Sequence, residues 1–123
     1  MNFTVLSQPL AVCRLAPQTP IPFSVLDLAF CAITRTEDEL SIVLPVDQAE
    51  ADWEVEKVWR GLKIEGPLDF SMVGVIAKIS APLAEAGIPI FVISTFDTDY
   101  LLVKEESFEV AIEVLKKGGH AIE

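Results

Sequence analysis

The fold is decided by the stretch Pro67–Val103, which reads PLDFSMVGVIAKISAPLAEAGIPIFVISTFDTDYLLV. Apolar residues recur in its first half at three- and four-residue steps, which stack side chains on one face of a helix. Gly87 can adopt the left-handed conformation that ends a helix, and β-branched and aromatic residues follow it. The stretch therefore predicts a helix, a strand, a short polar turn at Asp97 and Thr98, and a return strand. The apolar helix positions are Met72, Val75, Ile76, Ile79, Leu83 and Ala86.

Two residues near the start of this helix and one inside it modify the prediction. Asp69 or Ser71 can accept hydrogen bonds from the free amides of the first turn. Pro82 removes one helical hydrogen bond and costs about 3 kcal/mol, so we expect a kink or an irregular turn there. The strands that follow are expected at 90–96 and 100–103.

The flanking segments extend the pattern in both directions. We expect a helix from Ser107 to the terminator Gly118-Gly119. Near the start of the chain, three prolines leave room for only one helical turn, at 24–28. From 55 to 122 the order is β, α, β, β, α, β, which predicts an α+β, ferredoxin-like sandwich with two helices on one face of a four-stranded sheet. The first half repeats this order in degenerate form, without a matching residue period. We expect domains at 1–54 and 55–123, with further strands at 3–6, 10–15, 30–34, 40–44, 53–64 and 120–122, and a short helix within 46–52.

Composition limits the partners. The chain has 19 acidic and 9 basic residues, for a net charge of -10. Such a charge repels phosphate backbones and anionic lipid heads, so neither nucleic acid nor a membrane is expected as a partner. The start lacks a secretory signal and apolar runs stop short of about 20 residues, which predicts a cytoplasmic protein. Because 51% of the residues are hydrophobic, we expect some apolar surface to be buried in a homodimer.

Signals for catalysis, metals and cofactors are weak. Cys13 and Cys31 are expected to be reduced and buried, and with His120 they lack the spacing of metal ligands. A nucleophilic device would need His120 to reach Ser94 or Cys31, whereas a solvated or edge-strand histidine is the simpler interpretation. No glycine-rich phosphate loop is present in the sequence. We therefore expect no enzyme activity, no cofactor and no metal.

The predicted helix start suits a carboxylate. Residues Ser71–Ile76 combine free backbone amides with the positive end of a helix dipole. Gly74 would let a ligand approach the backbone closely, although it can also serve only to pack the helix tightly on the sheet.

The predicted turn suits a cation. Asp97 and Asp99 flank Thr98, and an ammonium or guanidinium group needs such acceptors for strong, charge-assisted hydrogen bonds. Asp97 can instead bond to its own backbone within the turn, so Asp99 is the harder of the two to explain by local structure.

Several stretches together resemble the ACT domain family, and in particular small bacterial proteins with tandem ACT domains. These are Trp59-Arg60, the segment 62–67, Gly74–Ala77, Pro82–Ile88 and Ser94–Tyr100. The resemblance covers about 55–122, and it extends loosely over the first 45 or so residues. It implies a regulatory module that binds amino acids or other small metabolites at an interface between two domains.

The resemblance also implies the residues of the site. Beside Ser71 and Met72 at the helix start, it places Val73, Gly74, Val75 and Ile76 at the ligand carboxylate. It places Thr95, Phe96, Asp97, Thr98 and Asp99 at the amino group or side chain. The leading hypothesis is a ligand-binding sensor without catalysis. The alternatives are a protein-interaction subunit without a small ligand and an enzyme that uses paired carboxylates.

Overall fold

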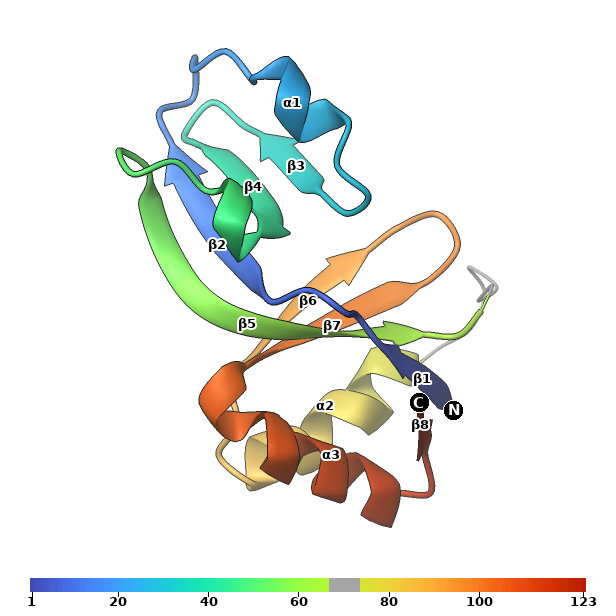
Figure 1. Cartoon of the computed structure of the whole chain (residues 1–123). Helices are drawn as coiled ribbons and strands as arrows, with labels where there is room; N and C mark the ends of the chain where they lie inside the picture. Colours follow the sequence, from blue (N-terminus) through green and yellow to red (C-terminus); the bar gives the residue numbers. More distant parts are fainter. Residues whose placement is uncertain (67–73) are drawn as a thin grey trace. The chain divides into compact units, whose positions relative to one another are not determined.

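The structure is a computed structural model that describes residues 1–66 and 74–123 (Figure 1). The chain divides into two compact units. The small unit comprises Gln8–Trp59, and the large unit comprises Met1–Ser7 together with Arg60–Glu123. One long strand, β5 (Glu54–Ile64), begins in the small unit and ends in the large one. Residues 1–7 thus group with the second half of the chain, whereas the sequence analysis placed them in a domain ending at 54.

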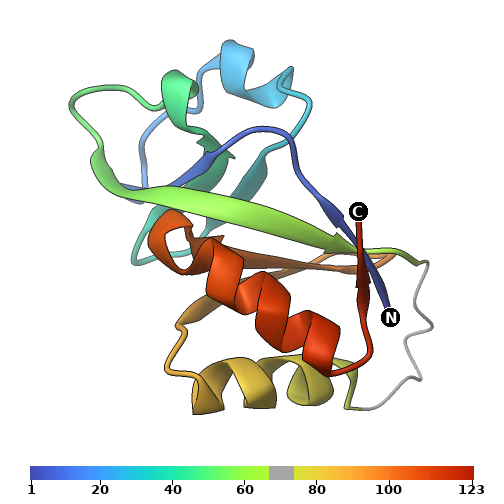
Figure 2. The same ribbon diagram turned by 60° about the horizontal axis from the view of Figure 1, so that its bottom comes forward.

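The large unit has the predicted element order with one added strand. Its sheet follows the order β6-β7-β5-β1-β8, in which β1 pairs antiparallel with β5 and parallel with β8. Without β1 this is the ferredoxin-like arrangement. Helices α2 and α3 lie side by side over one face of this sheet (Figure 2). The elements are β1 (Asn2–Val5), the end of β5, α2 (Val75–Glu85), β6 (Ile90–Ser94), β7 (Asp99–Lys104), η2 (Glu105–Ser107), α3 (Phe108–Lys117) and β8 (Ala121–Ile122).

The core of the large unit joins the helices to the sheet. Leu83 from α2 and Leu115 from α3 are almost fully buried against Leu62 and Ile64 of β5. Arg60 lies on the same side of β5 by strand alternation, and its guanidinium carbon is 4.6 Å from the centroid of the Phe108 ring. This cation–π contact explains how a charged residue is accommodated on an otherwise apolar face.

Helix α2 ends as predicted but starts later. Gly87 has φ 76°, and the amides of Gly87 and Ile88 donate to the carbonyls of Ala84 and Leu83 in the Schellman pattern. The helix begins at Val75 after Gly74, which has φ 77° and no side-chain cap. Asp69 and Ser71, the predicted caps, lie outside the described residues.

Helix α2 continues through Pro82. The irregular turn expected there is absent from the described helix, because Ala86 donates to the Pro82 carbonyl at 3.1 Å. Because proline has no amide hydrogen to donate, one helical hydrogen bond is lost, one turn before the helix ends.

A four-residue turn connects β6 to β7. The Thr95 amide donates to the Thr98 carbonyl at 2.8 Å, and the Thr95 hydroxyl accepts from the Thr98 amide at 3.3 Å. Thr98 is 5% exposed, and its hydroxyl donates to the Ile64 carbonyl at 2.7 Å. This bond ties the turn to the end of β5.

The small unit repeats the same topology with reduced helices. Its sheet order is β3-β4-β2-β5, the order of a ferredoxin-like sheet in which the start of β5 is the last strand. Val25 of α1 packs on the core side chains Cys13 and Leu15 of β2. The elements are β2 (Leu10–Leu15), α1 (Phe23–Leu26), β3 (Ala32–Arg35), β4 (Leu40–Pro45) and η1 (Val46–Gln48).

The histidine near the C-terminus generates a pH prediction. Burial lowers the pKa of His120, and the nearby Met1 ammonium lowers it further. Since the unfolded imidazole binds its proton more tightly, the free energy of unfolding should fall as pH drops below the ordinary histidine value of about 6.5. Urea unfolding of wild type and His120→Gln at about pH 7 and about pH 5.5 tests this. The wild type should lose more stability than the variant, and equal losses would contradict the prediction.

The buried hydroxyl of Thr98 generates a second prediction. Thr98→Val keeps the shape of the side chain but leaves the Ile64 carbonyl without this donor. We expect the free energy of unfolding to fall by about 1–3 kcal/mol, the cost of a lost buried hydrogen bond. Thr98→Ser is the control, because it retains the hydroxyl and should lose less stability in urea titration. A valine variant as stable as wild type would contradict a role for this bond.

Candidate functional site

A polar hollow of about 250 Å³ lies in the large unit, between the end of β5 and the β6–β7 turn. It brings together charges of both signs and three hydroxyl-bearing side chains. The described residues that line it are Lys63, Gly66, Thr95, Asp97, Thr98 and Tyr100.

Strand alternation places Lys63 at this hollow. Leu62 and Ile64 face the helices, so the side chain between them lies on the opposite face of the sheet. The Lys63 ammonium is 3.9 Å from a carboxylate oxygen of Glu65, whose other oxygen accepts from the Thr4 hydroxyl at 2.6 Å. The lysine and glutamate side chains are 38% and 43% exposed. Such an exposed pair contributes about 0–1 kcal/mol, so Lys63 can exchange Glu65 for a ligand carboxylate at little cost.

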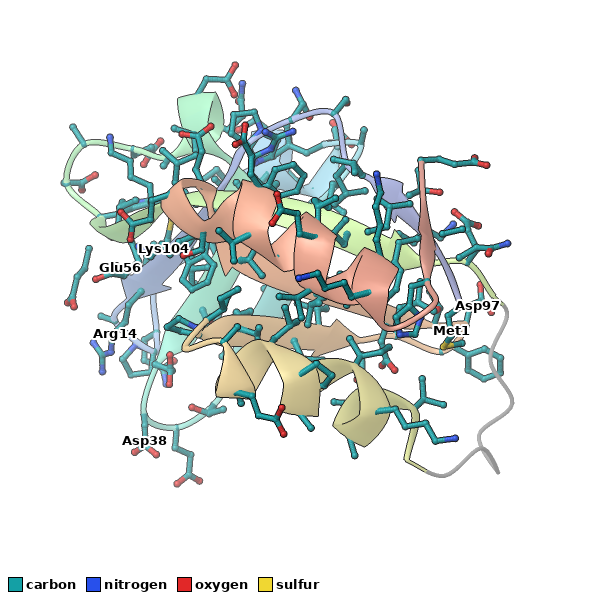
Figure 3. All side chains as sticks on the ribbon, turned by 90° about the horizontal axis from the view of Figure 1, so that it is seen from below. Met1, Arg14, Asp38, Glu56, Asp97 and Lys104 are labelled. Atoms are coloured by element: carbon teal, nitrogen blue, oxygen red, sulfur yellow. The ribbon has the colours of Figure 1, made fainter. Side chains whose placement is uncertain are left out.

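The two acidic residues of the hairpin are in different situations. Asp97 is exposed and lines the hollow, and Figure 3 shows it near the end of the hairpin. The side chain that hydrogen-bonds to the turn backbone is the hydroxyl of Thr95 rather than the carboxylate of Asp97. Asp99 is half-buried, and it accepts from the Ser94 hydroxyl at 2.5 Å. Asp97 is therefore the more available acceptor, the reverse of the order that the sequence suggested.

The other predicted site residues divide into three groups. Ser71, Met72 and Val73 lie outside the described residues. Gly74 is exposed at the helix start, whereas Val75 and Ile76 pack against the core, so only their backbone amides can serve a ligand. At the turn, Thr95 lines the hollow and Thr98 mainly anchors the hairpin. Phe96 is 80% exposed at the turn and does not line the hollow. The structure thus gathers only part of the predicted set.

Sequence reasoning missed Lys63, Gly66 and Tyr100. The signal for Lys63 was present, since alternation in the segment 53–64 already put it opposite Leu62 and Ile64. Tyr100 and Gly66 gave no such signal, because their position at the hollow depends on the pairing of β7 with β5.

The turn of the large unit has a counterpart in the small unit. Residues 36–39 connect β3 to β4 with the sequence Thr-Glu-Asp-Glu, and 95–98 read Thr-Phe-Asp-Thr. The Thr36 amide donates to the Glu39 carbonyl at 2.9 Å, and its hydroxyl accepts from the Glu39 amide at 3.2 Å. The expected repeat rested on element order without a matching residue period, and the structure adds a local match: a threonine and an aspartate recur at the same places in the turn.

Other kinds of site find little support in the described part of the chain. Within residues 1–66 and 74–123, no three His, Cys, Asp or Glu side chains are grouped to hold a metal ion. Both cysteines are free, and burial raises the pKa of the Cys13 thiol. The His120 ring packs edge-on against Phe3, and Met1 lies 3.0 Å from its Nδ1. Among these same residues, no helix has the length and apolar character needed to cross a membrane.

Known proteins resemble this chain over most of its length. The human protein named cytosolic arginine sensor for mTORC1 subunit 1 is 36% identical over 110 residues, which cover 83% of this chain and 32% of the human protein. The bovine protein of the same name is also 36% identical, over 73% of this chain and 30% of its own length. The chain thus spans about a third of the length of the curated relatives that it matches.

Two solved structures agree with the fold described above. A crystal structure of a protein from Agobacterium tumefaciens is 36% identical, has a TM-score of 0.92, and covers 99% of this chain and 91% of its own. The regulatory subunit of aspartate kinase from Thermus flavus has a TM-score of 0.68 at 11% identity. The match covers 96% of this chain and 97% of the Thermus flavus chain, and it shows that the two share a fold.

Family models divide the chain near the start of β5. A model described as an N-terminal domain matches residues 9–52, most of the small unit. The model described as the ACT domain matches residues 54–117, which make up more than half of the chain. Together with the ferredoxin-like topology of both units, this match shows that the chain belongs to the ACT domain family.

Proposed function

We propose that this protein is a regulatory module that binds a free amino acid or a similar small metabolite and has no catalysis of its own. The observation that carries the proposal is the hollow of the large unit, where Lys63 and Asp97 present opposite charges to one small space. A zwitterion matches such a pair, because its carboxylate and ammonium each find a charge-assisted partner. Membership of the ACT family supports the regulatory role.

The ligand would lie with its carboxylate toward Lys63, the cation among the described residues that line the hollow. The start of α2, where Gly74 precedes the first turn, also favours an anion, but these residues do not line this hollow. The ligand ammonium would meet Asp97, with Asp99 as a second negative charge behind it. The hydroxyls of Thr95 and Tyr100 at the same hollow can orient the polar groups of the ligand.

The names of the relatives support the same function. The human and bovine proteins are named cytosolic arginine sensors, and the Thermus flavus structure is a regulatory subunit. For this chain we infer a cytoplasmic sensor, with the amino acid itself left to experiment. The net charge of -10 argues against nucleic acid and anionic membranes as partners.

Binding should be visible as stabilisation. An amino acid present at about 100 times its dissociation constant should add roughly 2.7 kcal/mol to the free energy of unfolding. A thermal-shift screen of the common amino acids at millimolar concentration tests this, and the absence of any shift would overturn the proposal. For the amino acid that gives the largest shift, Asp97→Asn should weaken binding by about 2 kcal/mol, or roughly 30-fold, in calorimetric titration.

Asp99→Asn is the matched control for this titration. The substitution is chemically identical and lies two positions away, but the Asp99 carboxylate already accepts a hydrogen bond from the Ser94 hydroxyl. Its effect on affinity should be several-fold smaller than that of Asp97→Asn. An equal or larger effect would make Asp99 the main acceptor, as the sequence alone suggested.

The protein is also proposed to act as a homodimer built from chains that each carry two ACT-like halves. The high apolar content supports this assembly, and so does the placement of ligands between domains that is typical of the ACT family. Light scattering at tens of micromolar should give a mass twice the 13.5 kDa of one chain. A single-chain mass would contradict the dimer and would leave the hollow of the large unit to bind without a second chain.

A further inference from the structure

A second polar hollow, of about 330 Å³, lies in the small unit at the end of β2 and the start of β5. Arg14 and Glu54 are directly paired across these antiparallel strands, so their side chains share one face. Asp52 and Trp53 precede Glu54 at the same hollow. Its described lining includes Arg14, Ala16, Thr19, Asp52, Trp53 and Glu54.

The basic residue of this hollow repeats the one in the large unit. Arg14 precedes the last residue of β2, as Lys63 precedes the last residue of β5, and each of these strands opens the ferredoxin-like order of its unit. The neighbours of Arg14, Cys13 and Leu15, are buried in the core, so the arginine lies on the opposite face. Each unit therefore places a cation at the same position of its first strand, beside a polar hollow.

The turn that recurs between the units contacts this basic residue. The Arg14 Nη2 donates to the backbone carbonyl of Asp38 at 3.1 Å, and both residues are labelled in Figure 3. This bond uses one of the five N–H donors of the guanidinium, which leaves donors that can face a ligand carboxylate. Arg14 is thus held in place by the turn while it remains able to bind an anion.

The negative side of the hollow is stronger than the positive side. The segment 47–56 contains five acidic residues and no basic residue, and two of these acids line the hollow. Trp53 is half-buried, and an indole face attracts ammonium and guanidinium groups. A ligand that satisfies the hollow carries one carboxylate for Arg14 and at least one cationic group for Asp52, Glu54 and Trp53.

We propose that the small unit holds a second binding site, which takes an α-amino acid and favours one with a cationic side chain. The site uses residues of the small unit alone, and it does not require the site of the large unit to be occupied. Two ligands per chain are expected, one at Asp97 and one at Arg14.

Tryptophan fluorescence isolates the new site. The chain has two tryptophans, so Trp59→Phe leaves Trp53 as the only tryptophan, which is excited at a wavelength that Tyr100 does not absorb. Titration of this variant with lysine should change its emission to saturation, and lysine should bind at least 10-fold more tightly than glutamate. The added substitution Asp97→Asn should leave the titration unchanged. A signal that disappears with Asp97→Asn would belong to the first site and would overturn the inference.

Charge substitutions test which residues form the site. Arg14→Gln and Glu54→Gln should each weaken the Trp53 response at least 10-fold, and Glu54→Gln leaves the bond from Arg14 to Asp38 intact. Glu50→Gln is the matched control, because it removes the same charge from the same segment but does not line the hollow. Equal weakening by Glu50→Gln would show a general charge effect and would overturn the site.

The number of ligands bound per chain, measured by calorimetric titration, tests the second site without the Trp59→Phe variant. Titrated with lysine, the wild type should bind one more ligand per chain than Arg14→Gln does. One site in both proteins, removed by Asp97→Asn, would overturn this inference and leave the proposed function standing. One site that Arg14→Gln removes and Asp97→Asn keeps would support the second site and would show that lysine does not occupy the first. No heat with lysine in any variant would overturn this inference, whereas the thermal-shift screen decides the proposed function.

Discussion

The alternation of buried and exposed side chains along β5 is the constraint from which the site of the large unit follows. Leu62 and Ile64 must face α2 and α3, because they complete the core beneath these helices. The side chain between them is then forced onto the open face, where Lys63 meets the β6–β7 turn. The hydroxyl of Thr98 bonds to the Ile64 carbonyl and holds that turn at the strand end. Packing on one face thus sets the position of a charge on the other.

The same constraint explains what the sequence could and could not predict. Local signals were sufficient for the order of elements, for the glycine cap at Gly87 and for both hairpins, because each depends on neighbours in the chain. The role of β1 was not predictable in this way. Its pairing joins Phe3 to Ile64 on one side and to Ile122 on the other. Periodicity shows that residues 3–6 form a strand, but it carries no information on which strands become its partners.

The candidate site was predictable only in part, for a related reason. Asp97 was named because acidic side chains stand out in a short turn, whereas Thr95 was named only through the resemblance to the ACT family. The sequence ranked Asp99 above Asp97, because the hydrogen bond from Ser94 joins two strands and is not visible in a linear reading. Lys63 and Arg14 were overlooked as a pair, although each is the single charged residue between two core positions at a strand end. Comparing the halves by strand position, rather than by a fixed residue period, would have found them.

Both units have a basic residue near the end of their first strand and a similar turn, but they differ in the helix that follows this strand. Three prolines between β2 and β3 restrict the small unit to the four-residue α1, whereas α2 of the large unit has 11 residues. A four-residue helix offers little dipole, so a ligand at Arg14 would depend on side-chain charges. Interactions between exposed side-chain charges weaken with ionic strength over a Debye length of about 8 Å. A site built in this way on the small unit would therefore lose affinity as salt is added.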